Sequence, residues 1–174
     1  MVGSLSFFCI RRLLSGFFLT FIQVSKDFLA QAGDPTATGT GGESIWSFVA
    51  SDSSSNPPSR YFPPEIQPKL KHTHKGTVSM AVAPALEDHK GGCGSQFFIT
   101  LGDNIDYLDG KHAVFGHVVE GLDTLDKLNE VFVDQDGRPF KDVRIRHVVI
   151  LGTFLFLVSL TFYLEDLNSL RKYR

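Results

Sequence analysis

The sequence predicts a mainly β domain with one helix, because short alternating segments are separated by turn residues. Residues 76–83, 97–101 and 113–119 alternate apolar with small or polar side chains, as half-buried strands do. Residues 143–150 alternate in their first half and end in an apolar run, which indicates a buried strand. Short strands at this spacing favour a closed β-sheet or barrel.

Residues 122–129 have a helical period instead. Leucines recur every three positions from Leu122 to Leu128, which places them on one helical face. Asp123 and Asp126 supply the N-terminal cap and the first-turn acid that favour a helix start here.

The composition is that of an ordinary globular protein with one domain. The chain has 174 residues, 43% of them apolar and 21% charged. A formal net charge of -2 gives no basic face for direct nucleic-acid binding. The two cysteines, Cys9 and Cys93, provide no disulfide framework and favour a reducing compartment.

Two apolar runs lie near the ends of the sequence. Residues 13–22 have the length of a signal-peptide core, but no small-residue cleavage site follows them. Residues 148–164 are uncharged over 17 positions, which is the lower limit for a membrane span. Gly152 and many β-branched and aromatic residues favour a buried strand that runs into an apolar tail. Membrane contact is therefore not expected, and a tether at 148–164 is the alternative.

The loops offer no clear phosphate site. Residues 39–42 are rich in glycine but lack the spacing and the Lys-Ser/Thr of a P-loop, so a tight turn is the simpler interpretation. Residues 51–59, SDSSSNPPS, form a loop in which two prolines exclude regular structure.

Three histidines and one cysteine are candidate metal ligands. His72, His74, His89 and Cys93 have spacings that can converge on zinc, but they lie in Gly- and Pro-rich loops. Solvated loop histidines are the simpler interpretation, so no metal is expected.

Ser95, His112 and Asp109 include the residue types of a hydrolytic triad. Ser95 is not in a nucleophile elbow, and Asp109-Gly110 has the pattern of a turn rather than of a buried orienting group. We do not expect a triad.

A set of apolar and amide side chains remains on or beside the predicted strands. Taken alone, its Phe and Leu members are more typical of a core than of a site. The set consists of Phe28, Leu29, Gln31, Met80, Ala81, Gln96, Phe98, Tyr107, Leu108 and His112.

Four motifs that contain this set resemble the cyclophilin family, in the family's order. The resemblance implies an eight-stranded closed barrel with capping helices. The motifs are FLAQAGDPTATGTGGESIW (28–46), KGTVSMA (75–81), GSQFFIT (94–100) and YLDGKHAVFGHVVEGLDTLDKL (107–128).

The resemblance also implies a domain organisation. Residues 21–151 form the cyclophilin-like domain, whereas 1–20 and 152–174 do not resemble the family. Family members have two strands and a helix before this point, so the barrel is expected to be incomplete at the N-terminus, as in a truncated isoform or a mis-spliced gene model. FVDQDGRPFKDVRIRHVVIL (132–151) resembles the subgroup whose isomerase domain precedes an RNA-recognition motif.

By this resemblance, the chain is a peptidyl-prolyl cis-trans isomerase that assists protein folding without a cofactor. Rotation about an X-Pro amide needs no nucleophile, because its barrier arises from amide resonance. The subgroup implies a nuclear location, with the cytoplasm as the alternative. The expected partners are proline-containing peptides or proteins.

The resemblance assigns site roles residue by residue. Gln31 and Gln96, which with Gln23 are the catalytic candidates, would hold the substrate backbone or position neighbouring groups. Tyr107 replaces the family's usual Trp, so little or no binding of cyclosporin-type ligands is expected. The substrate-binding positions are Phe28, Leu29, Phe98 and Leu108 in the ring pocket, Ala81 on its floor, and Tyr107 and His112 at its rim.

Gln23 occupies the position of the family's catalytic Arg. A neutral amide forms weaker hydrogen bonds than a guanidinium, and loss of one preorganised donor costs about 10²–10³ in rate. We therefore expect weakened isomerase activity, and a non-catalytic proline-peptide binding module is the alternative function.

Overall fold

The computed structural model describes residues 19–49, 59–85, 91–145, 149–150 and 158–159. The predictions for the N-terminal apolar run up to residue 18, for His89 and for most of 148–164 therefore concern residues outside the described part.

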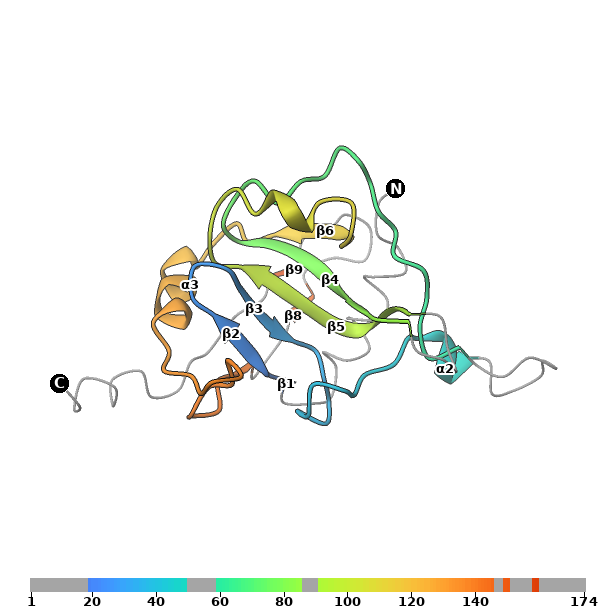
Figure 1. Ribbon diagram of the computed structural model, residues 1–174, viewed down its shortest axis with the longest axis horizontal. Coiled ribbons are helices and arrows are strands. Elements are labelled where there is room, and N and C mark those ends of the chain that lie inside the picture. The colour runs from blue at the N-terminus through green and yellow to red at the C-terminus, as the bar shows by residue number, and fades with distance from the viewer. Residues whose placement is uncertain (1–18, 50–58, 86–90, 146–148, 151–157, 160–174) are drawn as a thin grey trace.

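The centre of the molecule is a five-stranded antiparallel sheet in the order β2-β3-β5-β4-β6 (Figure 1). Two smaller sheets pair β1 with β7 and β8 with β9. The strands are β1 (Leu19–Thr20), β2 (Gln23–Ser25), β3 (Leu29–Ala32), β4 (Thr77–Ala83), β5 (Gly92–Thr100), β6 (Val114–His117), β7 (Arg144–Ile145), β8 (Val149–Ile150) and β9 (Val158–Ser159); the helices are α2 (Trp46–Val49), the 3₁₀ turn η2 (Asp106–Leu108) and α3 (Leu122–Asn129).

The mainly β fold is confirmed, and each predicted strand overlaps an observed one. The predicted helix has the observed bounds of α3. The strand predicted at 97–101 is longer than expected, because β5 begins at Gly92, which pairs with Ala83. The hydrogen-bonded strands of the described residues belong to three sheets, so closure into an eight-stranded barrel stays a prediction.

The predicted cap of α3 is wrong. Gly121, with φ 81°, occupies the N-cap position, and no side-chain cap hydrogen bond is present in this described helix. Asp123 is the second residue of the helix, in the first turn, where its negative charge interacts favourably with the helix dipole. The helix is tied to the sheet by Asn129, whose side chain exchanges hydrogen bonds of 2.8 and 2.7 Å with Asp27.

One face of the central sheet forms the main hydrophobic core. Strand residues alternate between the two faces of a sheet, so every second residue of β3 and β5 points inward. Ala30 and Ala32 are 0% exposed in this core, where they meet Phe97 and Ile99 of β5. The apolar side of α3 packs against the same core through Leu125 and Leu128.

The opposite face of the same strands forms a second, smaller cluster. Its buried members are Leu29, Phe98, Ile105 and Leu108, with Phe28 and Ala81 packed against them. Met80 belongs to the first face instead: it is 0% exposed and lies in the main core, one position before Ala81 on β4. Its inclusion among the candidate site residues was therefore wrong, because neighbouring strand residues point to opposite faces.

Among the described residues, we find no helix with the length and apolar character needed to cross a bilayer.

Candidate functional site

The second cluster brings together the side chains that the sequence predicted as a ring pocket. Phe98 is 1% exposed and Leu108 is 6% exposed, and both belong to one buried cluster with Leu29. Phe28 is half-buried, and its ring lies 5.5 Å from that of Tyr107. Tyr107 is 56% exposed, so it forms an open rim rather than a buried wall.

The turn from residue 105 to 112 presents three of these side chains. The 3₁₀ turn η2 contains both Tyr107 and Leu108, and the amide of Leu108 donates to Ile105 O. The amide of His112 then donates to Leu108 O at 3.2 Å, which folds the chain back over the cluster. This local folding explains why residues from one short segment reach a common site.

His112 lies at the rim of the cluster with a fixed orientation. Its ring meets Phe98 edge to face, with 5.1 Å between centroids and 82° between planes. Its Nδ1 lies 3.1 Å from Met80 O, and because a carbonyl can only accept, Nδ1 carries the hydrogen. Burial lowers the pKa of His112, and the hydrogen bond to Met80 opposes this shift only in part.

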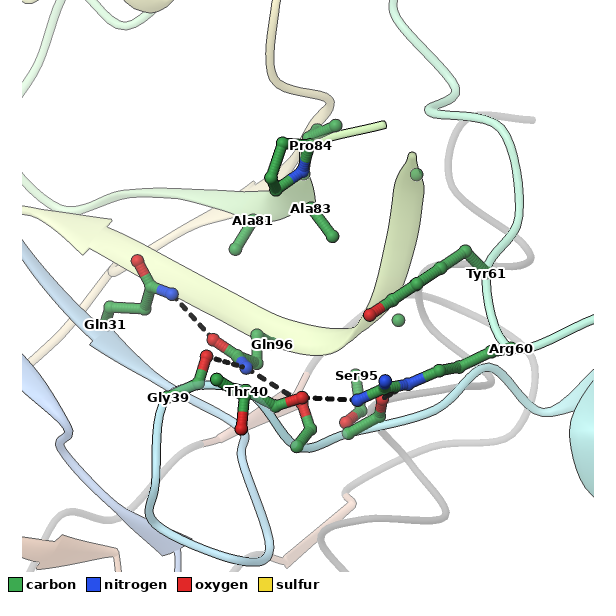
Figure 2. A pocket seen from close by; sticks show the side chains of 15 residues that line it. Gln31, Gly39, Thr40, Arg60, Tyr61, Ala81, Ala83, Pro84, Ser95 and Gln96 are labelled. Carbon is green, nitrogen blue, oxygen red and sulfur yellow. Dashed lines mark hydrogen bonds between the residues drawn. The ribbon is translucent and has the colours of Figure 1, made fainter. Parts of the chain in front are cut away.

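Gln31 and Gln96 form an amide pair beside the cluster. Gln31 Nε2 donates to Gln96 Oε1 at 2.7 Å. Gln96 Nε2 donates in turn to Gly39 O at 3.0 Å and to Gly41 O at 2.8 Å. Figure 2 shows the two amides pointing toward each other from β3 and β5, with the glycine loop below them.

The glycine loop is held from several sides. Asp34 is almost fully buried, and its carboxylate accepts hydrogen bonds from the backbone amides of Thr36, Gly39 and Gly41. Burial alone would raise the pKa of Asp34, but these bonds and the Thr36 hydroxyl outweigh it and lower the pKa. Arg60 donates to Thr40 O and, at 3.3 Å, to Gly42 O. Alternate carbonyls of the loop therefore bind Gln96 and Arg60.

A cavity of about 330 Å³ opens next to the amide pair (Figure 2). Both members of the amide pair, Gln31 and Gln96, line this cavity. Ala81, which packs against the apolar cluster, lines it as well. Its other lining residues are Gly39, Thr40, Gly41, Gly42, Arg60, Tyr61, Val82, Ala83, Pro84, Gly92, Gly94 and Ser95.

Sequence reasoning missed much of this cavity wall. The interpretation of the glycine loop as a tight turn is incomplete, because the loop also lines the cavity. Arg60, whose guanidinium lies 5.1 Å from the Tyr61 ring centroid, follows a Ser- and Pro-rich loop that carries no recognisable signal.

Gln23 lies on the outer strand of the sheet and is exposed. It is paired in register with Gln31, so the two side chains leave the same face of the sheet. The Gln23 side chain lies against the turn at Gly137: a Cβ on that glycine would be 3.3 Å from Gln23 Cγ and 3.8 Å from its Nε2. Gln23 is absent from the described lining of the cavity.

The residues considered for a triad do not assemble into one. Ser95 Oγ donates to Gly33 O at 2.8 Å, and it is fully buried. Asp109 binds His72 rather than His112. The view of Asp109 as a turn residue alone was therefore incomplete, because it does orient a histidine.

The interpretation of His72 as a solvated loop histidine is wrong, since it is 1% exposed. Its two ring nitrogens face Asp109 and Ser79, whereas His74 is exposed. Within the described ranges, no group of three or more His, Cys, Asp or Glu side chains could hold a metal ion.

Comparison with known proteins places this site in a family. Residues 11–150 match the family model described as "Cyclophilin type peptidyl-prolyl cis-trans isomerase/CLD". The chain is 70% identical over 132 residues to "Peptidyl-prolyl cis-trans isomerase-like 4" from Cryptococcus neoformans, and 52% identical over 128 residues to the human protein of that name. These matches cover 75% and 74% of this chain but 26% and 24% of the relatives, so the chain spans about a quarter of their length.

Solved structures agree with the sequence comparison. A crystal structure of a cyclophilin type peptidyl-prolyl cis-trans isomerase from Cryptosporidium parvum has a TM-score of 0.71 and 32% identity, and the match covers 86% of this chain and 85% of that one. A second structure of that protein, in the presence of the dipeptide Ala-Pro, has a TM-score of 0.66 and 34% identity, with 83% and 82% covered. By its family match, its relatives and its fold, the chain belongs to the cyclophilin-type peptidyl-prolyl cis-trans isomerase family.

Proposed function

We propose that this chain isomerises X-Pro bonds of peptides and unfolded proteins, and so assists protein folding, with a turnover weakened by Gln23. The observation that carries the proposal is the apolar cluster around Phe98 beside the Gln31–Gln96 amide pair, on one face of one sheet. An apolar surface can hold a proline ring while the amides bind the backbone on either side of it. The crystallised Cryptosporidium relative was studied with the dipeptide Ala-Pro, which supports this substrate class.

The two glutamines have different roles in this proposal. An amide nitrogen has two hydrogens, and Gln96 directs both of them to carbonyls of the glycine loop. Gln96 therefore acts by orienting Gln31. Gln31 gives one hydrogen to Gln96, which leaves its second N–H and its carbonyl oxygen for the peptide backbone.

The reaction requires that the site bind the twisted amide better than either planar form. Twisting removes amide resonance and concentrates a lone pair on the prolyl nitrogen, which a donor can stabilise. In this chain the position that the family gives to an arginine holds Gln23, an exposed neutral donor on the outer strand. We infer that binding of proline peptides is retained while the rate enhancement is reduced by about 10²–10³.

The test is a protease-coupled cis-to-trans assay on a proline peptide, with the wild-type chain and Gln23→Arg. We expect Gln23→Arg to raise kcat/KM about a hundredfold, because it restores a charged donor. Gln67→Arg, a substitution of another exposed glutamine, controls for added charge and should leave the rate unchanged.

The alternative is a proline-peptide binding module without catalysis, and the neutral, exposed Gln23 favours it. The two functions separate in the same experiment. If the wild-type chain and Gln23→Arg both bind the peptide in a titration but neither accelerates isomerisation, the chain is a binding module.

We also infer a nuclear location from the subgroup that the sequence resembles, with the cytoplasm as the alternative. Matches to relatives named peptidyl-prolyl cis-trans isomerase-like 4 support that subgroup. Fluorescence imaging of the tagged chain in a eukaryotic cell would decide between the two compartments.

A further inference from the structure

His72 is a buried imidazole for which the proposed reaction has no direct use. Its side chain is 0% exposed, although it lies in an irregular segment between Phe62 and β4 and is two residues from the exposed His74. Both nitrogens of a buried imidazole need hydrogen-bond partners. The identity of those partners shows what this ring holds in place.

Both partners of His72 are well defined. Its Nδ1 lies 2.8 Å from Asp109 Oδ1, and its backbone N–H donates to the same oxygen at 2.9 Å. A carboxylate can only accept, so Nδ1 carries the hydrogen. Nε2 lies 2.8 Å from the Ser79 hydroxyl, which can donate to this nitrogen or accept from it.

The ring of His72 also packs on the central aromatic side chain of the apolar cluster. It lies nearly parallel to Phe98, with 6.0 Å between centroids and 22° between planes. Ser79, which holds Nε2, is the direct cross-strand partner of Phe98. His72 therefore fixes one face of the Phe98 ring, whereas His112 meets that ring edge to face.

Asp109 connects His72 to the turn that presents the rest of the pocket. Asp109 directly follows Tyr107 and Leu108, and its second oxygen pairs with Lys71 Nζ at 3.3 Å. The amide of Ile105 donates to His72 O at 2.9 Å, which ties the same turn to His72 a second time. One imidazole thus joins the turn, strand β4 and the Phe98 ring.

We propose that His72 is a positioning residue for the proline pocket: it holds Phe98 and the turn with Tyr107 and Leu108 in the arrangement that receives the proline ring. This inference rests on the proposed function. His72 is buried and does not touch the substrate, so it acts through Phe98 and Asp109. A side chain with a merely structural role would change stability and leave the geometry of the pocket intact.

The test compares three variants of the full 174-residue chain. His72→Asn keeps a donor near Asp109 but removes the ring and the nitrogen that pairs with the Ser79 hydroxyl. Ser79→Ala removes one hydroxyl and leaves the imidazole in place. His74→Asn changes the neighbouring exposed histidine and is the matched control.

Two measurements are made on each variant. Methyl NMR of Leu29 and Leu108 in the free chain reports the position of the aromatic rings, because both leucines belong to the same buried cluster as Phe98. A titration with a proline peptide reports affinity. We expect His72→Asn to shift both sets of methyl resonances and to weaken binding at least tenfold, since a small displacement of a positioning contact has effects of this size. Ser79→Ala should give smaller changes of the same kind, and His74→Asn should give none.

The outcomes separate the two proposals. Unchanged methyl resonances and affinity in folded His72→Asn and Ser79→Ala would overturn the positioning role. A wild-type chain that binds no proline peptide would overturn the proposed function, while the methyl resonances of the free chain would still test His72. If circular dichroism shows that His72→Asn does not fold, Ser79→Ala decides.

Discussion

Gln31 and Gln96 lie 65 residues apart in the sequence, yet Gln31 Nε2 donates to Gln96 Oε1 at 2.7 Å. The direction of this bond is fixed by the loop carbonyls that accept from Gln96 Nε2. The glycine loop therefore orients Gln96, and through it the Gln31 amide that we propose to bind the substrate backbone.

Replacement of Gln96 by Glu should disrupt the hydrogen bonds between Gln96 and the glycine loop. A carboxylate cannot donate, so the carbonyls of Gly39 and Gly41 would face an oxygen instead of an N–H. We expect the free energy of unfolding to fall by about 1–3 kcal/mol and proline-peptide affinity to fall with it. Urea unfolding and peptide titration measure the two effects. Gln67→Glu is the control, and an equal loss in both variants would contradict the prediction.

A second prediction concerns Gly33 and Gly39, which have nearly the same backbone conformation. Their φ values are +95° and +90°, so alanine is strained at both by about 1–2 kcal/mol. At Gly33 the added Cβ would also collide with Ser95 O and lie 2.9 Å from Gln96 Cα, whereas at Gly39 it would meet nothing within 4 Å among the described residues. Gly33→Ala should therefore lower stability clearly more than Gly39→Ala in thermal unfolding. Equal losses would show that the backbone strain alone matters.

The lowered pKa of His112 predicts a pH dependence of stability. Burial disfavours the charged His112 ring in the folded state, while a histidine in the unfolded chain has a pKa near 6.5. Below about pH 6.5 the unfolded state therefore binds more protons than the folded state. The stability that the uncharged His112 contributes is fully present above about pH 6.5 and is lost as the pH falls through the folded pKa.

Urea unfolding at pH 7.5 and 5.5 measures this dependence. His112→Gln keeps a donor for Met80 O but does not titrate, so its stability should fall less between the two pH values than that of the wild-type chain. His74→Gln, at an exposed position, should behave like the wild type. An identical pH dependence in His112→Gln and wild type would exclude His112 as a source.

Tyr107 should limit the binding of cyclosporin-type ligands. It lies against Phe28 but is 56% exposed, and its ring is smaller than the indole that the family usually has there. Tyr107→Trp adds apolar area at the rim and should tighten binding about tenfold. Competition between such a ligand and a proline peptide measures the change. Tyr61→Trp enlarges a second aromatic residue, on the cavity wall, and should not reproduce it.

The fold was predictable where the sequence pattern is local. The alternation at 76–83 and the leucine spacing at 122–129 gave the strand and the helix that the structure contains. The beginning of β5 at Gly92 was not predictable from its Gly-Cys-Gly pattern, because that part of the strand is defined by pairing with β4 and with Phe62.

The candidate site was predictable where residues match family motifs, and the structure places Phe98, Leu108 and Leu29 in one cluster. Contacts between residues that are distant in the sequence were not predictable. His72 has a loop-like context, and its burial depends on Ser79 and on Asp109, which is 37 residues away. The contacts of Arg60 with the glycine loop likewise follow from the three-dimensional fold alone.

Every residue of β3 points either to the main core or to the candidate site. Leu29 and Gln31 belong to the candidate site, and Ala30 and Ala32 belong to the core. Deletion of one residue from β3 would exchange the two sets, because side chains alternate with a period of two. A change in the length of β3 would therefore disrupt the core and the candidate site together, whereas a substitution at one position alters only the face to which that side chain points.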